Sequence, residues 1–281
     1  MINEKVIIDA LKEIGIEETD SVFVHSSLKS FGWVDGGAKT VISALQRCVA
    51  KGTLLMPAFC QKHFAYAYTT WDLQNSPSDV GVITECFRKK SGVLRSNQAT
   101  HSVCAFGENA KYFTMTHTEG RGRIGVYGDT PFSYSSPFEK MYHAGAKVVF
   151  LGCGFEVNTF SHLVEYKIVN DVIDAISDEI KKKQAVEEIL TFEDLVPFRL
   201  KKGDIPQNKC WLNICRENIQ QFMEERGMLR TALCGNAKII SFLVRDYVDL
   251  QYYEVVNNPE LWLDGQAAAW FYKYSSFYEE I

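Results

Sequence analysis

A histidine and a glutamate stand three residues apart in the stretch "NTFSHLVEY", which covers Asn158–Tyr166. Positions i and i+3 share one face of a helix, so the Glu165 carboxylate can reach one nitrogen of the His162 ring. Such a bond fixes the tautomer of the imidazole and leaves the other nitrogen to accept a proton. Histidine, with a reference pKa of about 6.5, needs little tuning to act as a base near neutral pH. The same spacing is also typical of a structural pair on a helix surface, so both interpretations stay open.

Other catalytic motifs are incomplete, because each lacks a residue that it requires. An H-x-x-E-H zinc motif would need a histidine where Tyr166 stands, and neither H-E-x-x-H nor C-x-x-C occurs, so we expect no metal. In "GCGFEV", Val157 replaces the third glycine of a dinucleotide fingerprint. The glycines Gly152 and Gly154 favour a tight turn where a ligand or another backbone comes close. Cys153 in that turn could be a nucleophile, although buried free cysteines are more often inert.

The candidate pair follows one of several short apolar runs that alternate with helical patterns. "SVFVHSSL" and "TLLMPAF" are typical of strands, and "GGAKTVISALQRCVAKG" between them has apolar residues at helical spacing. This strand–helix–strand order indicates an α/β layered fold. We expect further strands at "THSVCAFG" and "AKVVFLGCG", a helix over 78–90, and a long loop at "TEGRGRIGVYGDTPFSYSSP". Four acids near one helix face are typical of a solvated surface but could attract a cation: Asp171, Asp174, Asp178 and Glu179.

Composition limits the class of protein. The 281 residues are 46% hydrophobic and 23% charged, with a formal net charge of −5, which is ordinary for a globular protein. The acidic excess argues against a nucleic-acid partner, which would favour a basic stripe. No run reaches the roughly 18 apolar residues of a membrane span, and the start "MINEKVIIDALKEIG" carries acids, unlike a secretory signal. With eight scattered cysteines, these features predict a cytoplasmic protein with reduced thiols and no membrane partner.

No linker or low-complexity segment divides the chain. We therefore expect one domain over 1–281, in which the part after about residue 166 adds helices and a substrate-side extension. The late aromatic cluster "WFYKYSSFY" is typical of a core or of an oligomer contact, which leaves a homodimer open.

Three blocks in order, over Val22–Tyr166, resemble the aminoglycoside 3-N-acetyltransferase family, which is distinct from the GNAT acetyltransferases. "VFVHSSLKSFGWVDGGAKTVISALQRCVAKGTLLMPAF" is similar to the family's first block, with its H-x-S-L turn and G-T-L-x-M-P strand. "GVLRSNQATHSVCAFG" is similar to the R-S-x-H-P-x-x-S-x-x-x-G block, and "SPFEKMYHAGAKVVFLGCGFEVNTFSHLVEY" to the block ending in N-T-x-x-H-x-x-E. The chain departs from the pattern where Gln98 and Ala99 replace the usual His-Pro and where Ala58 replaces a frequent threonine.

The resemblance implies a three-layer α/β/α fold with a mixed central sheet and acetyl-coenzyme A as the donor. It implies His162 as the general base and Glu165 as its orienting partner. It also implies a coenzyme cleft lined by Ser26, Ser27, Leu28, Ser102 and Val103.

The expected reaction is direct transfer of acetyl to an amino group of a small-molecule acceptor, an aminoglycoside or another amino sugar. Alternative acceptors are sugar nucleotides and polysaccharide precursors. A catalytically silent protein that binds or senses coenzyme A is a further alternative, as is a hydrolase that uses Cys153 with His162.

Overall fold

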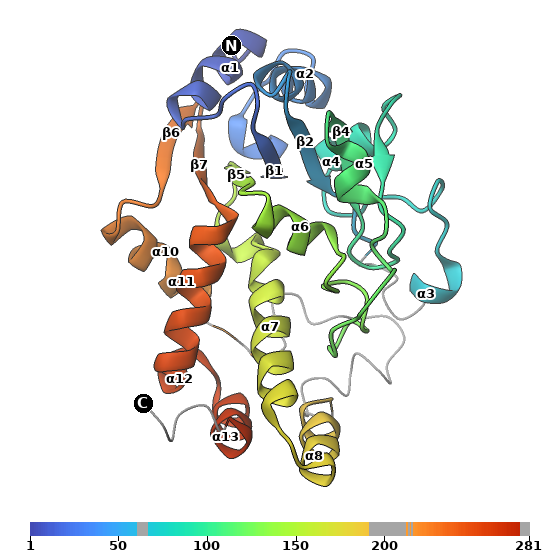
Figure 1. Cartoon of the computed structure of the whole chain (residues 1–281). Coiled ribbons are helices and arrows are strands. Elements are labelled where there is room, and N and C mark those ends of the chain that lie inside the picture. Colours follow the sequence, from blue (N-terminus) through green and yellow to red (C-terminus); the bar gives the residue numbers. More distant parts are fainter. Residues whose placement is uncertain (61–66, 191–211, 213, 215, 276–281) are drawn as a thin grey trace.

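A mixed seven-stranded sheet lies at the centre of the molecule, with the strand order β3-β4-β2-β1-β5-β7-β6 (Figure 1). The computed structural model describes all residues except 61–66, 191–211, 213, 215 and 276–281. The strands are β1 (Ser21–Ser26), β2 (Thr53–Pro57), β3 (Leu94–Arg95), β4 (Val103–Gly107), β5 (Lys147–Leu151), β6 (Arg230–Cys234) and β7 (Ala237–Leu243). β2, β1 and β5 run parallel, and antiparallel strands flank them on both sides.

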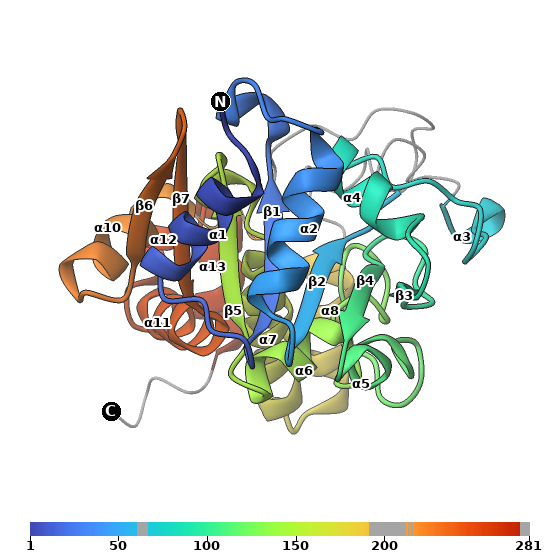
Figure 2. The same cartoon turned by 90° about the horizontal axis from the view of Figure 1, so that it is seen from above.

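Helices cover both faces of the sheet because side chains alternate along each strand. On β1, Val22 and Val24 join one core and Phe23 joins the other. One core packs beneath α1 (Glu4–Glu13), α2 (Ala38–Cys48) and α4 (Val82–Arg88). The other packs beneath α5 (Ala110–Thr114), α6 (Pro137–His143), α7 (Phe160–Ala175) and α11 (Val244–Asn257). Figure 2 shows the sheet between these two helical layers. The expected three-layer α/β/α arrangement with a mixed sheet is confirmed.

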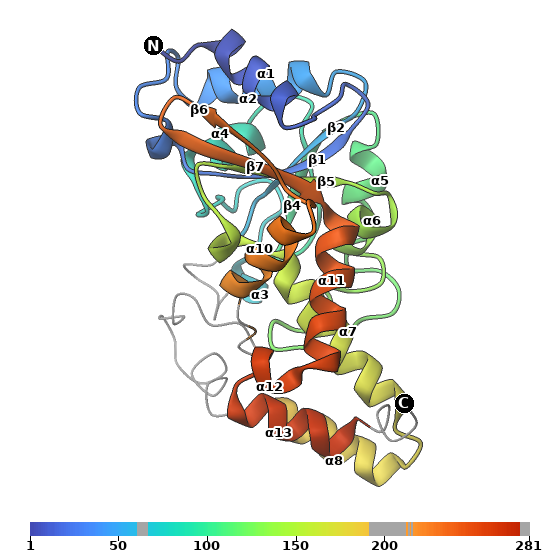
Figure 3. The same ribbon diagram turned by 90° about the vertical axis from the view of Figure 1, so that its left-hand side faces the viewer.

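The C-terminal part of the chain adds a helical extension beyond the sheet. α7 projects away from the sheet with α11 beside it, and the extension lies at their far end (Figure 3). The extension contains α8 (Glu179–Leu190), α12 (Pro259–Trp262) and α13 (Gly265–Tyr274); α3 (Ala67–Thr70) and α10 (Arg216–Glu225) lie elsewhere. Trp270 on α13 donates through Nε1 to the Ala185 carbonyl on α8 at 3.0 Å. Trp270, Phe271 and Tyr274 of the late aromatic cluster are buried and contribute to the core, whereas Tyr272 is exposed.

Two expected elements can be compared with the structure directly. The helix expected over 78–90 begins only at Val82, because the Ser78 amide donates to the Glu85 side chain at 2.8 Å and Gly81 adopts a φ of 137°. The expected long loop is confirmed, since 118–136 contains neither helix nor strand. None of the helices in the described residues has both the length and the apolar character of a membrane span.

Candidate active site

The His162–Glu165 pair lies where the strand order reverses. β1 leads through α2 to β2 on one side, whereas β5 pairs with the other side of β1. Ligands of open α/β sheets bind outside the carboxyl ends of strands at such a switch point. β5 ends at Leu151, a turn follows, and α7 begins at Phe160, so His162 stands on the first turn of the helix beyond this edge.

The turn after β5 is tied to the segment after β1. Ser30 donates through Oγ to the Gly152 carbonyl at 2.6 Å, and its Oγ lies 2.9 Å from Ser27 Oγ. Gly152 adopts a φ of +70°, and a Cβ there would lie 2.5 Å from the Ser30 Cβ. Only glycine fits this close approach without strain, which agrees with the tight turn expected from the sequence.

His162 and Glu165 form the expected hydrogen bond. The His162 Nδ1 and the Glu165 Oε2 lie 2.7 Å apart, and the Glu165 side chain is fully buried while 12% of the His162 side chain is exposed. The other carboxylate oxygen, Oε1, accepts a bond from the backbone amide of Leu212 at 3.1 Å. Because an ionised carboxylate only accepts, Nδ1 carries the proton and Nε2 is the nitrogen that can accept one from a substrate.

Three aromatic rings surround the His162 imidazole. Tyr127 and His101 meet it edge to face, with centroids 5.1 Å and 5.9 Å away, and Phe132 lies 5.9 Å away. His101 is 1% exposed. Burial lowers the pKa of His101 well below its usual value, and the neighbouring His162 and His117 lower it further. The sequence patterns did not single out these three wall residues, because no local spacing relates them to His162.

Two of the wall residues come from the long loop, and α7 holds that loop in place. Four residues beyond His162 on α7, the Tyr166 hydroxyl accepts from the Tyr127 amide and donates to the Gly128 carbonyl, both at 3.0 Å. A Cβ on Gly125 would lie 2.0 Å from the Tyr166 ring, so only glycine permits this contact. Tyr166, which stands where the H-x-x-E-H motif would need a histidine, therefore holds the loop beside the candidate base.

Residues one and two turns further along the same face of α7 also bond to the long loop. Asn170 bonds to both backbone groups of Ile124 at 2.9 Å, and Asp174 pairs with Arg121. Asp171 accepts a bond from a tyrosine of α11 at 2.9 Å. Asp178 accepts from the Lys181 amide at 2.8 Å, so three of the four acids on this run have partners within the chain. In the described part of the chain, no group of three or more His, Cys, Asp or Glu side chains is arranged to hold a metal ion.

The residues expected to line a coenzyme cleft divide into two groups. Ser26 ends β1, and its Oγ is buried without a hydrogen-bond partner among the described residues. Ser27 donates its amide to the Leu151 carbonyl at 2.9 Å, and Leu28 begins a short 3-10 helix. These three residues lie at the same sheet edge as the turn before α7, and their coenzyme contacts stay a prediction.

Ser102 and Val103 lie at the start of β4, and their side chains are buried. The Ser102 hydroxyl donates to the Ala58 carbonyl at 2.7 Å and accepts from Arg95 Nε at 3.0 Å. Val103 belongs to the apolar core. Their role toward a coenzyme also stays a prediction.

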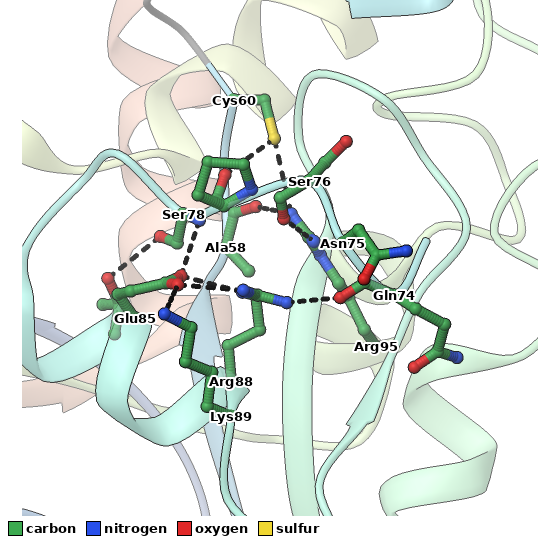
Figure 4. Close-up of polar contacts among 12 residues, drawn as sticks. Ala58, Cys60, Gln74, Asn75, Ser76, Ser78, Glu85, Arg88, Lys89 and Arg95 are labelled. Carbon is green, nitrogen blue, oxygen red and sulfur yellow. Dashed lines mark hydrogen bonds and ion pairs between the residues drawn. The ribbon is translucent and has the colours of Figure 1, made fainter. Parts of the chain in front are cut away.

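Arg95 bonds to Ser102 and to the segment that follows β2, and Figure 4 shows its contacts with that segment. Its guanidinium donates to the carbonyls of Ala58 and Ser76 and to the Cys60 sulfur, and it stacks over Trp71 at 4.4 Å. This network connects Ser102, the residue after His101, to the backbone that follows β2.

A second ion cluster holds the same segment from α4 (Figure 4). Arg88 makes two bonds of 2.8 Å to Glu85 and one of 2.6 Å to the Gln74 carbonyl. Burial raises the pKa of the Glu85 carboxyl, but bonds from Arg88, Lys89 and the Ser78 amide outweigh it and bring the pKa to about 2. Glu85 is thus ionised whenever the chain is folded near neutral pH.

The alternative nucleophile, Cys153, is a free thiol in the turn after β5. Burial, with a smaller effect of Glu156, raises the pKa of the Cys153 thiol to about 12. Because the thiolate is the reactive form, this residue is poorly suited to nucleophilic catalysis at neutral pH.

A buried amide lies just before α7. Asn158 is fully buried, and its Oδ1 accepts from the Phe160 amide at 3.2 Å. Its Nδ2 has no hydrogen-bond partner among the described residues. Leaving such a donor unpaired costs about 1–3 kcal/mol, so this group is a candidate for a bond to a ligand oxygen.

The fold and the site define a class: a three-layer α/β/α protein with a histidine bonded to a buried glutamate at the switch point of a mixed sheet. The model of the family described as aminoglycoside 3-N-acetyltransferase matches residues 23–253. The chain belongs to the aminoglycoside 3-N-acetyltransferase family.

Two relatives illustrate the sequence similarity. The chain is 31% identical over 183 residues to the SPbeta prophage-derived aminoglycoside N(3')-acetyltransferase-like protein YokD of Bacillus subtilis, covering 58% of this chain and 64% of that protein. It is 27% identical over 173 residues to aminoglycoside N(3)-acetyltransferase VII of Streptomyces paromomycinus, covering 55% and 57%. The matches thus span less than two thirds of the length of these curated relatives.

Solved structures share the fold over nearly the whole chain. The crystal structure of YokD from Bacillus subtilis has a TM-score of 0.68 at 22% identity and covers 92% of this chain and 95% of that one. A binary complex of AAC-IIIb with CoASH gives 0.66 at 18%, covering 91% and 96%. A mutant of aminoglycoside acetyltransferase AAC(3)-IVa in complex with a gentamicin gives 0.69 at 19%, covering 95% and 93%.

Proposed function

We propose that this protein transfers an acetyl group from acetyl-coenzyme A to an amino group of an aminoglycoside or a related amino sugar. The single observation that carries the proposal is the buried Glu165 carboxylate with one oxygen on His162 and the other on the Leu212 amide. That arrangement suits a base held in one orientation. Membership of the family, a neighbour solved with CoASH and another solved with a gentamicin support the donor and the acceptor.

The chemistry follows from the protonation state of an amino sugar. Its amine is mostly protonated near neutral pH and attacks a thioester only after it loses a proton. That first proton goes to solvent. As the neutral amine attacks, its nitrogen gives a second proton to His162 at Nε2, and the Glu165 carboxylate stabilises the imidazolium that forms. The new nitrogen–carbon bond replaces the carbon–sulfur bond, and His162 returns the proton to the leaving sulfur. Because the Cys153 thiol stays protonated, we propose direct transfer without an acetyl-enzyme.

Two buried polar groups that have no hydrogen-bond partner among the described residues are suited to contact a thioester substrate. The Ser26 hydroxyl is buried, with no partner among the described residues, at the sheet edge where we propose coenzyme contacts with Ser27 and Leu28. The Asn158 Nδ2 is a buried donor, likewise unpaired within the described chain, next to the first turn of α7. We propose that it donates to the thioester oxygen as negative charge develops there, the role that electrostatic stabilisation of an acyl transfer requires.

Release of free thiol from acetyl-coenzyme A tests the function. The purified protein is mixed with acetyl-coenzyme A, alone and with a panel of aminoglycosides and other amino sugars. We expect acceptor-dependent release, and a loss of about 10²–10⁴-fold in turnover for His162→Ala with little change in coenzyme affinity. Binding of the coenzyme without release for any acceptor would indicate the silent alternative. An acetyl-enzyme detected by intact mass without acceptor would contradict direct transfer.

A further inference from the structure

Another buried histidine, His117, has a hydrogen-bond partner at each ring nitrogen. It stands shortly after α5 and is 1% exposed. Its Nδ1 lies 2.8 Å from the Ser96 hydroxyl, and its Nε2 lies 3.0 Å from the Pro131 carbonyl oxygen. Ser96 directly follows β3, whereas Pro131 belongs to the long loop over 118–136. The imidazole of His117 thus connects the sheet to the loop that supplies part of the wall around His162.

These two partners determine the tautomer of His117. A carbonyl oxygen only accepts, so Nε2 carries the proton and donates to Pro131. Burial lowers the pKa of His117 to about 3, so the ring is neutral and its Nδ1 is an acceptor. The Ser96 hydroxyl donates to that Nδ1, and the hydroxyl oxygen accepts from the Val103 amide at 2.8 Å. His117 is therefore an Nε2–H imidazole, the reverse of the Nδ1–H form of His162.

Three successive residues of the long loop are held by side-chain hydrogen bonds at this point. Pro131 accepts from His117, as described above. The carbonyl of Phe132 accepts from Nη1 of Arg123, a buried guanidinium, at 2.9 Å. The Ser133 hydroxyl donates back to the His117 carbonyl at 2.9 Å. Because this part of the loop contains neither helix nor strand, these side-chain bonds take the place of a regular backbone ladder in fixing it.

The side chain that this network places is the ring of Phe132. The ring is fully buried, and its centroid lies 4.8 Å from that of Phe138, 4.9 Å from that of Tyr166 and 5.9 Å from that of His162. The hydrogen bond to Glu165 fixes one atom of the His162 imidazole but leaves the ring able to tilt about that bond. An aromatic ring packed beside the imidazole restricts that tilt.

We propose that His117 is a positioning residue for the base: its hydrogen bond to the Pro131 carbonyl holds Phe132 against His162. Without that bond the buried carbonyl has no donor, and the loop moves to find one, which takes the Phe132 ring away from the imidazole. His117 therefore acts through Phe132 and not on the substrate.

The inference rests on the proposed acetyl transfer and adds a residue that keeps the base in its productive place. A misplacement of about 1 Å caused by a change away from the reacting atoms can lower turnover about 10²-fold. Binding of the coenzyme does not depend on the tilt of the His162 ring. Loss of the bond between His117 and Pro131 should therefore lower kcat and leave the KM for acetyl-coenzyme A unchanged.

Two neutral amide variants of His117 test this role, because each keeps one of its two side-chain bonds. His117→Gln places an NH₂ group near the position of Nε2 and can still donate to Pro131. His117→Asn places an oxygen near the position of Nδ1 and can still accept from Ser96. Each variant loses one buried bond, so the two should lose similar thermal stability. We expect kcat to fall about 10–100-fold in His117→Asn and to stay within about threefold of the wild type in His117→Gln.

Equal turnover of these two variants, or turnover that simply follows their thermal stability, would show that His117 only stabilises the loop and would overturn the proposal. Ser133→Ala and Ser241→Ala provide a second, milder pair, because each removes a buried hydroxyl that donates to a carbonyl oxygen. The Ser133 hydroxyl donates to His117, whereas the Ser241 hydroxyl on β7 donates to Ile14 at 2.6 Å. We expect kcat to fall about 3–10-fold in Ser133→Ala only, and equal losses in both variants would contradict the proposal.

A measurement without substrate keeps the inference separable from the proposed function. The ¹⁵N chemical shifts of the histidine rings should show an Nε2–H tautomer for His117 in the wild type. The His162 ring signals should change in His117→Asn and stay nearly unchanged in His117→Gln. An Nδ1–H tautomer of His117 would overturn the proposal even if neither variant folded. Absence of acceptor-dependent thiol release by the wild type would instead remove the proposed function.

Discussion

Glu165→Gln is the most informative single change. Glu165 accepts a hydrogen bond at each of its two oxygens, and neither orientation of a glutamine amide can accept both bonds. Leu212 donates a backbone N–H to Oε1, and His162 donates Nδ1–H to Oε2. A glutamine side chain has one oxygen and one NH₂ group, so it can accept only one of these bonds. The Leu212 amide cannot change, whereas an imidazole can move its proton. The glutamine oxygen should therefore face Leu212, and its NH₂ should face His162.

This orientation reverses the tautomer of the base. With an NH₂ donor at its Nδ1, His162 must accept there and carry its proton on Nε2, the atom that should take a proton from the substrate. Reversal of this kind costs on the order of 10⁴ in turnover in comparable histidine sites, so we expect a loss of about 10²–10⁴-fold. Both bonds persist in altered form, so the free energy of unfolding should change by no more than about 2 kcal/mol.

Stability measurements separate this effect from general damage. Glu165→Ala leaves two buried donors unpaired at about 1–3 kcal/mol each, so it should lower the free energy of unfolding by about 2–6 kcal/mol. Glu254→Gln is the control: it alters another buried carboxylate, on α11, whose Oε1 lies 3.3 Å from Arg226, and should retain turnover.

Thiol release and the ¹⁵N shifts of His162 in Glu165→Gln are measured on the same sample. An Nε2–H tautomer with greatly reduced turnover is the expected pair of results. Turnover above about a tenth of the wild type, or an unchanged tautomer, would refute the role of Glu165 in orienting the base.

The remaining predictions concern single groups. Cys153→Ser should retain turnover, and a thiol-alkylating reagent at neutral pH should leave Cys153 unmodified, because burial raises the pKa of this thiol to about 12; inactivation by alkylation at that residue would revive the hydrolase alternative. Asn158→Ser keeps an oxygen to accept from Phe160 but loses the NH₂ donor, so kcat should fall about 10²–10³-fold with unchanged coenzyme affinity; wild-type kcat would exclude the proposed donor. The pKa of Glu85 in the folded protein is about 2, below its usual value of 4.5, so the ionised carboxylate stabilises the fold fully above pH 4.5 and this stabilisation is lost as the pH falls through 2. Glu85→Gln should therefore flatten the decline of stability over this pH range in acid-denaturation curves. An unchanged slope would contradict the role of the Arg88 pair.

Part of the site could be found from the sequence because it depends on one element. His162 and Glu165 are three residues apart, and the geometry of any helix brings positions i and i+3 together. The glycines after β5 indicated a tight turn, and Gly152 has both a positive φ and a close contact with Ser30. The alternation of apolar runs and helical patterns likewise predicted an α/β fold, because each pattern reflects a local period.

The sequence by itself therefore determined the layered α/β class, the strands that end at the site and the pair that can act as a base. Only the tertiary structure decided what surrounds that pair: the Leu212 amide 47 residues from Glu165, the wall of Tyr127 and Phe132, and the second histidine, His101. These contacts join separate elements across the edge of the sheet. Their existence depends on how α7, the long loop and the later chain pack together, and no period within a single segment records that packing.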